Sequence, residues 1–256
     1  MNFEHLTSFL EEKSDLYNRP EFIIVDPISI PHQFSKKEDI EISGFFAATI
    51  AWGQRPIILR NANRLMQLMD NAPHEFILHH SKNDLKSFSK FVHRTFNDAD
   101  CIYFIRSLKN IYRNHGGLQE VFSDNFKKTD TDPANAIHQF RKIFLELNHL
   151  KRTEKHIADP LANSSAKRIC MFLRWMVRKD KRGVDFGIWT NISMSRLACP
   201  LDLHAARVAR SLGLLQRKQN DWKAVMELTQ KLKELDPADP VKYDFALFGL
   251  GINEKF

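Results

Sequence analysis

Two side chains, a lysine and an aspartate, carry the clearest potential for chemistry in this sequence. Asp202 directly precedes an apolar helical stripe, and Lys167 opens another apolar segment, AKRICMFLRWMVRKD. A carboxylate at a helix start is fixed in position and kept ionised by the helix dipole, so it can stabilise developing positive charge or deprotonate a nucleophile. A lysine at a buried helix head can act as a neutral amine, attack an electrophilic carbon and form a Schiff base.

Both residues also have a plain structural interpretation, and the sequence leaves it open. Asp202 is a candidate N-cap, a role worth about 1 kcal/mol, and Lys167 is a candidate solvated lysine. His204 follows Asp202 by two positions and is expected to be structural, while the other histidines lack metal-ligand spacing such as HExxH. The three cysteines lack CxxC spacing. We therefore expect no metal, no iron–sulfur cluster and no other cofactor.

Helical periodicity runs through most of the chain and predicts an all-α fold of about ten helices. No run alternates with the period of a strand, and no internal repeat is visible. Three prolines predict an irregular, partly extended connection over residues 18–37. We expect residues 1–38 to form an N-terminal helix and this irregular segment, and residues 39–256 to form a two-lobed helical domain. The predicted helices cover residues 1–17, 40–52, 56–69, 98–114, 118–126, 133–150, 166–180, 200–214, 221–235 and 240–250.

A concentrated block of basic residues suggests a polyanionic partner. The chain has 38 Lys and Arg against 31 Asp and Glu, a net charge of +7. Residues 151–182 alone hold ten basic and three acidic residues, which equals the whole excess. The block also brackets Trp175 and Trp189, and aromatic rings among cations suit nucleic acid. The alternative interpretation is a solvated helix face.

Membrane and export signals are not visible in the sequence. The longest nearly apolar run, Phe45 to Trp52, is far shorter than the roughly 20 residues of a membrane helix. The opening MNFEHLTSFLEEK is mixed and acidic, unlike a signal or transit peptide. The cysteine usage is typical of a reducing compartment. These features predict a cytoplasmic protein that has no membrane partner.

Three segments follow one another in the C-terminal part of the chain: ICMFLRWMVR preceded by Ala166-Lys167, CPLDLHAARVARSLGLL, and DPVKYDFALFGLGI. Their order resembles the helix-hairpin-helix DNA glycosylase superfamily, which includes endonuclease III and 8-oxoguanine glycosylases. Asp202-Leu203-His204 is similar to the Asp-x-His element of that superfamily, and Lys167 matches its lysine position. FLRWMVRKD, PLDLH and DPVKYDFALFGLG are also similar to segments of a bacterial family of uncharacterised proteins.

The resemblance extends upstream and covers roughly residues 40–251. AATIAWGQRPIILRNANRL is similar to the helix–Ser-x-Gln–helix segment of the superfamily, and Gln54 matches a glutamine that enters the DNA stack there. The superfamily's hairpin usually reads Leu-Pro-Gly-Val-Gly, whereas this chain reads ADPLANSSAK. Without those glycines, anion contacts must come from Ser164, Ser165 or a helix N-terminus, or they are lost. Lys167 and Asp202 are 35 positions apart, which implies an insertion at about residues 180–197.

The resemblance implies a DNA N-glycosylase, with or without an AP-lyase step, that excises a damaged and flipped-out base from double-stranded DNA. Lys167 would be the nucleophile and Asp202 the electrostatic stabiliser, in a groove between two lobes. Flipped bases stack on aromatic rings, so Trp52, Phe186 and Trp189 are expected to form a base pocket; the alternative is that these rings anchor loops or belong to the core. The residues expected to contact DNA are Gln54, Arg55, Ser164, Ser165, Arg168, Arg174, Arg178 and Lys179.

Two other functions remain open at this point. The first is a catalytically silent nucleic-acid-binding protein that keeps the glycosylase fold, which the missing hairpin glycines favour. The second is an all-α module whose basic face binds another protein. The steepness with which salt weakens binding separates nucleic-acid binding from the protein-interaction module, because phosphate contacts release counterions.

Overall fold

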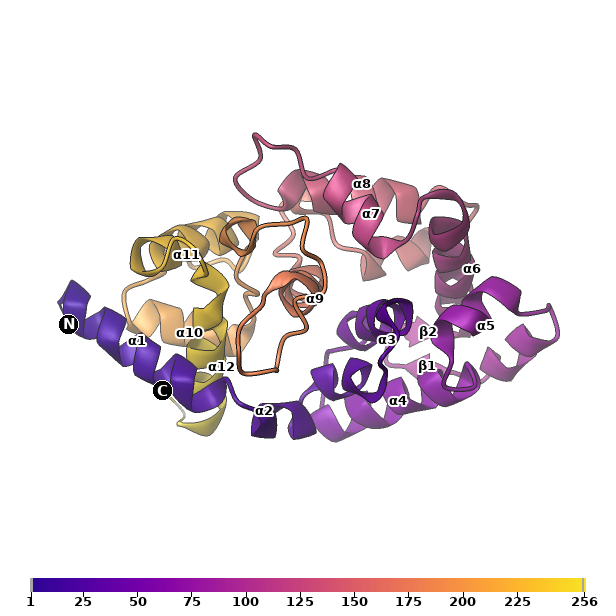
Figure 1. The fold of residues 1–256 in the computed structure, drawn as a ribbon, viewed down its shortest axis with the longest axis horizontal. Helices are drawn as coiled ribbons and strands as arrows, with labels where there is room; N and C mark the ends of the chain where they lie inside the picture. The colour runs from indigo at the N-terminus through magenta and orange to yellow at the C-terminus, as the bar shows by residue number, and fades with distance from the viewer. Residues whose placement is uncertain (1, 255) are drawn as a thin grey trace. The chain divides into compact units, whose positions relative to one another are not determined.

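The protein is built almost entirely of helices (Figure 1). A computed structural model describes residues 2–254 and 256. That part of the chain contains twelve α-helices, seven short 3-10 helices and one two-stranded antiparallel sheet, so the predicted all-α fold class is confirmed. The α-helices are α1 (Phe3–Tyr17), α2 (Pro20–Val25), α3 (Lys37–Thr49), α4 (Arg55–Leu68), α5 (Pro73–His79), α6 (Asp98–Asn114), α7 (Leu118–Asp124), α8 (Ala134–Phe144), α9 (Lys167–Val177), α10 (Leu203–Ser211), α11 (Trp222–Leu235) and α12 (Tyr243–Asn253).

The expected irregular connection over residues 18–37 is wrong, because this segment is largely helical. It contains α2 and the 3-10 helices η1 (Pro27–Ser29) and η2 (Pro31–Gln33). Each of these three helices begins with a proline. The first residue of a helix has no intrahelical acceptor for its N–H, so the N–H that proline lacks is not needed there. The prolines therefore start short helices here instead of preventing them. The remaining 3-10 helices are η3 (Asp84–Phe88), η4 (Lys151–His156), η5 (Pro160–Ala162), η6 (Met194–Arg196) and η7 (Pro240–Lys242).

The small sheet is also absent from the predicted elements. Its strands, β1 (Val92–His93) and β2 (Phe96–Asn97), pair Val92 with Asn97 and His93 with Phe96. Two residues per strand are too few to produce an alternating pattern that a sequence reading can recognise. The predicted helix over residues 133–150 likewise ends earlier, at Phe144.

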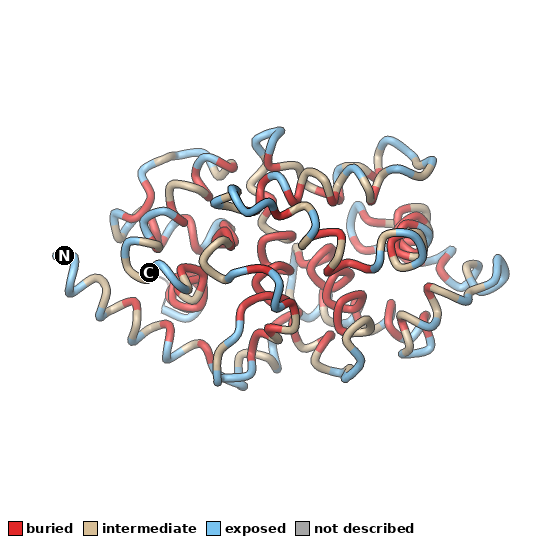
Figure 2. The backbone as a smooth tube through the Cα atoms, turned by 45° about the horizontal axis from the view of Figure 1, so that its top comes forward, coloured by how far each residue is buried: buried red, intermediate tan, exposed pale blue. Residues whose placement is uncertain are grey.

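The chain divides into two compact units. One unit joins the chain up to Phe22 with Lys128–Asn135 and the chain from Asp159 onward. The other holds Ile23–Lys127 and Ala136–Ala158. Each unit has its own buried core, and Figure 2 colours these buried segments red.

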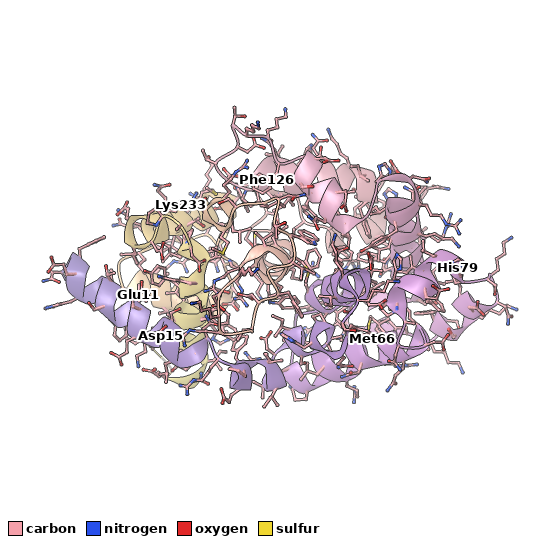
Figure 3. All side chains as sticks on the ribbon, viewed as in Figure 1. Glu11, Asp15, Met66, His79, Phe126 and Lys233 are labelled. Carbon is pink, nitrogen blue, oxygen red and sulfur yellow. The ribbon has the colours of Figure 1, made fainter. Side chains whose placement is uncertain are left out.

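In the first unit, α12 lies between α1 and α10. Its glycines permit this close packing: a Cβ added at Gly249 would overlap the Tyr17 ring of α1, and one at Gly251 would lie 2.9 Å from Cβ of His204 on α10. Glu11 and Asp15 lie along α1 (Figure 3). The N-terminal helix therefore packs directly against the C-terminal helix of this unit.

In the second unit, phenylalanines from three helices form one aromatic cluster. Phe104 of α6 lies 4.7 Å from Phe144 of α8, and Phe45 of α3 lies 5.6 Å from Phe140 of α8, between ring centroids. All four rings are fully buried. Such edge and offset contacts add to the stabilisation from buried apolar area. None of the helices among residues 2–254 and 256 is both long enough and apolar enough to cross a membrane.

Candidate functional site

Lys167 and Asp202 lie together although 35 positions separate them in the sequence. Lys167 is the first residue of α9, and Asp202 is the N-cap of α10. The Lys167 Nζ lies 3.9 Å from the Asp202 Oδ2. The side chains are 27% and 20% exposed, so both groups are partly shielded and still accessible. Two helix starts thus bring an amine and a carboxylate to one place in the first unit.

Asp202 serves as a helix cap and faces the lysine at the same time. Its Oδ1 accepts a hydrogen bond from the Ala205 N–H at 2.8 Å, which is the predicted N-cap geometry. Its Oδ2 is the oxygen nearest to Lys167. The helix behind it is fixed by buried Ala205, Val208 and their neighbours, and it stops before Gly213, which has a φ of +75°. The cap therefore holds the carboxylate rigidly beside the amine.

The turn before α9 adopts a left-handed conformation without using glycine. Asn163 has a φ of +62° and Ala166 a φ of +46°. Such angles favour glycine, and an alanine there carries strain of about 1 kcal/mol or more. The Asn163 side chain donates to the Asp221 carboxylate at 3.1 Å, and Asp221 caps α11. The left-handed turn therefore forms here without glycine, and the Asp221 cap of α11 contacts it.

Arg174 and Arg178 do not lie where the sequence analysis expected them. Each is only 3% exposed, so the prediction that they contact DNA phosphates is wrong. The Arg174 guanidinium pairs with Asp185 at 3.2 Å and also with Asp244. Burial of a charge is costly unless it is paired, and these carboxylates provide the pairing.

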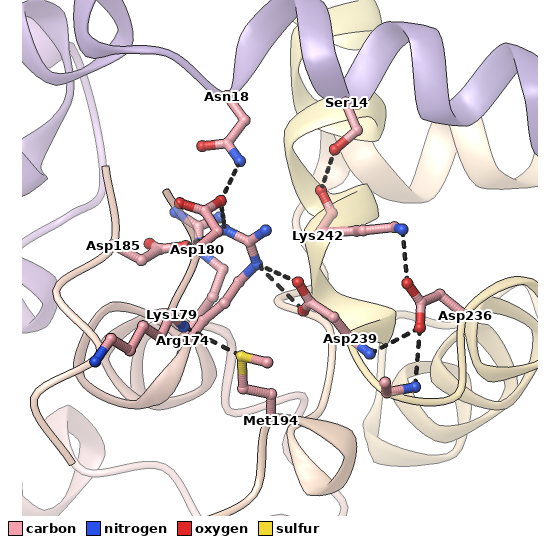
Figure 4. A network of polar contacts seen from close by, with 12 residues as sticks. Ser14, Asn18, Arg174, Lys179, Asp180, Asp185, Met194, Asp236, Asp239 and Lys242 are labelled. Carbon is pink, nitrogen blue, oxygen red and sulfur yellow. Dashed lines mark hydrogen bonds and ion pairs between the residues drawn. The ribbon is translucent and has the colours of Figure 1, made fainter. Parts of the chain in front are cut away.

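Arg178 lies at the centre of a second group of carboxylates. It contacts Asp180 at 2.8 Å, Asp185 at 3.1 Å and Asp239 at 2.9 Å. Figure 4 shows the three aspartates of this group from close by. These opposite charges raise the pKa of Arg178, although burial alone would lower it. The Asn18 side chain extends the network by donating to Asp180 at 2.7 Å. The network links the C-terminal end of α9 to Asn18, to the loop that follows α9 and to Asp239. It therefore stabilises the interior of the first unit.

The segment predicted as an insertion folds back onto α9 and buries its tryptophan. Trp189 is fully buried, its backbone N–H donates to the Met176 carbonyl at 2.9 Å, and its ring lies 5.4 Å from that of Phe172. The prediction of a base-pocket role for Trp189 is therefore wrong, and the alternative of loop anchoring holds. Trp175, which lies within the basic block, is fully buried as well. Phe186 remains half-buried.

The remaining predicted residues are distributed over both units. Ser164, Ser165 and Arg168 are half-buried near the Lys167 end of α9, and Lys179 is exposed. Burial lowers the pKa of Arg168 to about 10. The second unit holds Gln54, which is exposed as the N-cap of α4, together with Arg55 and Trp52. The Trp52 ring is half-buried, 6.0 Å from the His156 ring and 5.0 Å from that of His93.

The basic block is less available to a partner than its charge suggests. At least five of its ten basic residues form ion pairs: Arg152 with Asp100, Lys167 with Asp202, Arg182 with Asp15, and the two buried arginines with the carboxylates described above. Lys179 and Lys181 are exposed members of the block.

Asp244 is a member of the site that the sequence analysis missed. It lies in the first turn of α12 and is 7% exposed. Burial raises its pKa to about 6; Arg174 and Lys167 act to lower this pKa, and Asp202 acts to raise it. A signal was available, because Asp244 is the one carboxylic acid within the apolar run YDFALFGLGI. An isolated acid in a buried helix is a candidate for a tuned carboxyl group.

The comparisons with known proteins identify a family. A family model described as "Protein of unknown function (DUF2400)" matches residues 26–253. The chain belongs to this family. No curated protein and no solved structure matches the chain. Among residues 2–254 and 256, no group of three or more His, Cys, Asp and Glu side chains could hold a metal ion.

Proposed function

We propose that this member of the DUF2400 family is a DNA N-glycosylase that uses Lys167 and Asp202 to remove a damaged base. The observation that carries the proposal is the 3.9 Å approach of the Lys167 amine to the Asp202 carboxylate at two adjoining helix starts. A side chain that is partly exposed beside a fixed carboxylate can reach a substrate and still be oriented.

The proposed reaction needs only these two groups and the substrate. The Lys167 nitrogen, as a neutral amine, forms a bond to C1′ of the nucleotide while the C1′–N glycosidic bond breaks, and the base leaves with the bonding electron pair. Asp202 stabilises the positive charge that develops on the sugar and accepts the proton that the attacking amine loses. Opening of the sugar ring then gives an imine, which borohydride reduces to a stable protein–DNA adduct.

Borohydride trapping against a panel of duplexes tests the proposal directly. The panel carries oxidised, deaminated, alkylated and abasic sites, and wild type is compared with Lys167→Ala. Lys231→Ala is the matched control, because Lys231 is an exposed lysine of α11 that is not among the residues expected to contact DNA. We expect an adduct for wild type and the control and none for Lys167→Ala. If no duplex gives either an adduct or a released base, the proposed enzyme activity is wrong.

A second candidate function is a nucleic-acid-binding protein without catalysis. The observation in its favour is the same ion pair, because a carboxylate beside an ammonium stabilises the charged amine, which is not a nucleophile. This candidate predicts duplex binding that weakens steeply with salt, without adduct formation or base release.

A further inference from the structure

Two separate segments of the second unit carry basic residues and no acidic ones. Residues 50–69 include helix α4, and residues 86–97 include the hairpin formed by β1 and β2. Together they hold six lysines and arginines and no aspartate or glutamate: Arg55, Arg60, Arg64, Lys86, Lys90 and Arg94. A charge count over the whole chain hides this local excess, because acidic residues elsewhere in the chain offset it.

The hairpin runs along α4 in the direction opposite to the helix. Near its start, the ring of Phe91 lies 6.0 Å from the Arg64 guanidinium, in the last part of α4. At its tip, Arg94 packs against Gly53, just before α4 begins: a Cβ added at this glycine would lie 2.9 Å from the Arg94 Nη1. The fold therefore joins the two segments into one surface of the second unit, where Figure 1 shows β1 and β2 beside α4.

A buried histidine fixes the hairpin to the helix. His93 is 1% exposed, and burial lowers its pKa, so its ring is neutral at neutral pH. Its Nε2 donates to the Trp52 carbonyl at 3.1 Å, and its Nδ1 accepts from the Asn61 amide at 2.9 Å. Both ring nitrogens are thus used to hold the residue next to Arg94 in place.

The arginine at the hairpin tip has a strained backbone and an exposed side chain. Arg94 has a φ of +54°, a left-handed conformation that costs a residue with a side chain about 1–2 kcal/mol. Its exposed side chain provides no burial to offset this cost. Strain of this kind is concentrated at functional sites, where the position of a side chain matters more than stability.

Four cations of this surface are exposed and have no carboxylate partner. Within residues 2–254 and 256, the structure gives none of the four an ion pair: Arg60, Arg64, Lys90 and Arg94. Arg60 and Arg64 are one turn apart on the same face of α4. We call these four residues the α4–hairpin surface. They differ from the buried arginines of the first unit, whose charges are already neutralised.

We propose that the α4–hairpin surface binds the phosphate backbone of duplex DNA. Three of its four cations are arginines, whose planar guanidinium groups form paired hydrogen bonds with phosphate oxygens. Between Arg55 and Arg64 the helix rises about 14 Å, and one strand of a duplex carries a phosphate about every 3.4 Å of its axis. The choice of duplex DNA as the polyanion rests on the proposed function, whereas the unpaired charge of the surface does not.

The salt dependence of duplex binding tests this surface without any chemistry. Fluorescence anisotropy of an undamaged, fluorescein-labelled duplex gives the binding constant of the full chain at several salt concentrations. Wild type is compared with Arg60→Gln/Arg64→Gln/Arg94→Gln. Each lost phosphate contact lowers the slope of log K against log salt concentration by about 0.9, so we expect the slope of the triple variant to fall by about 3.

Lys82→Gln/Arg106→Gln/Lys142→Gln is the matched control. These three residues are exposed, belong to the same unit and carry the same total charge, but they lie outside the α4–hairpin surface. Arg106 is on α6, and Lys142 is on α8. We expect the control variant to keep the wild-type slope, because a general loss of positive charge does not remove a specific phosphate contact.

Three results would overturn the proposal. The first is a wild-type protein that does not bind the duplex, or whose binding is insensitive to salt. The second is the same slope for the triple variant and the control. The third is stronger competition by single-stranded RNA or polyglutamate than by unlabelled duplex, which would assign the surface to another polyanion. If the triple variant fails to fold, Arg60→Gln/Arg64→Gln is compared with Arg106→Gln/Lys142→Gln, and the expected fall in slope is about 2.

This proposal and the glycosylase proposal fail in different ways. A slope that falls in the triple variant, together with no trapped adduct and no base release from any duplex, would sustain the surface and refute the glycosylase function. An adduct that depends on Lys167, together with an unchanged slope in the triple variant, would sustain the enzyme and refute the surface.

Discussion

Arg178→Ala should strongly destabilise the protein, because this arginine neutralises three carboxylates. Arg178 is 3% exposed and contacts Asp180, Asp185 and Asp239. Removing one partner of a buried ion pair costs about 3–5 kcal/mol. Asp185 keeps its contact with Arg174, but burial already raises the pKa of Asp239, so the loss of Arg178 is felt most there. We expect the free energy of unfolding to fall by about 4 kcal/mol.

Urea unfolding at neutral pH measures this loss, and Arg182→Ala is the matched control. Arg182 pairs with Asp15 at the surface, with 40% of its side chain exposed. An exposed pair of this kind contributes about 0.5 kcal/mol or less. If Arg178→Ala costs no more than the control, the buried-network argument is refuted.

Three further predictions follow from the candidate site and its surroundings. Asp202→Asn should keep the α10 cap and leave the melting temperature of the protein unchanged, but it should abolish base excision. Asp202→Ala should abolish excision and also lower the free energy of unfolding by about 1 kcal/mol, measured by thermal unfolding. Gly249→Ala should cost about 1–3 kcal/mol in urea unfolding, because the new methyl group overlaps the Tyr17 ring; unchanged stability would mean that α1 can move away from α12. The pKa of Asp244, about 6, lies above its ordinary value, so the folded protein binds this proton more tightly than the unfolded chain does. The contribution of this proton to the free energy of unfolding is therefore present in acid and is lost as pH rises through about 6. Relative to Asp244→Asn, wild type should therefore lose up to about 3 kcal/mol of unfolding free energy between about pH 4 and pH 7, and a difference that stays flat with pH would contradict the assignment.

The local elements could be predicted well from the sequence. The pattern over residues 98–114 predicts one helix, and α6 spans Asp98–Asn114. Asp202 was predicted as an N-cap and is one. Both features depend on residues within a few positions of each other, since helix periodicity and capping are short-range interactions. The helix that opens with Lys167 was predicted for the same reason.

The roles of the charged and aromatic residues were decided by the tertiary structure alone. A count of charges cannot separate an exposed arginine from a buried one, because the carboxylates that neutralise Arg174 and Arg178 come from segments up to 70 positions away. Trp189 likewise became a core residue only when its loop folded back onto α9.

The sequence by itself determined ten of the twelve α-helices in the described part of the chain, all but α2 and α5, together with the cap at Asp202 and the pair of residues that deserve a chemical test. Tertiary packing determined that Lys167 lies 3.9 Å from Asp202, and that Asp244, buried in α12, shares their electrostatic environment. The physical reason is the range of the interactions. Helix formation depends on neighbours along the chain, whereas burial and charge pairing depend on groups that meet only in the folded protein.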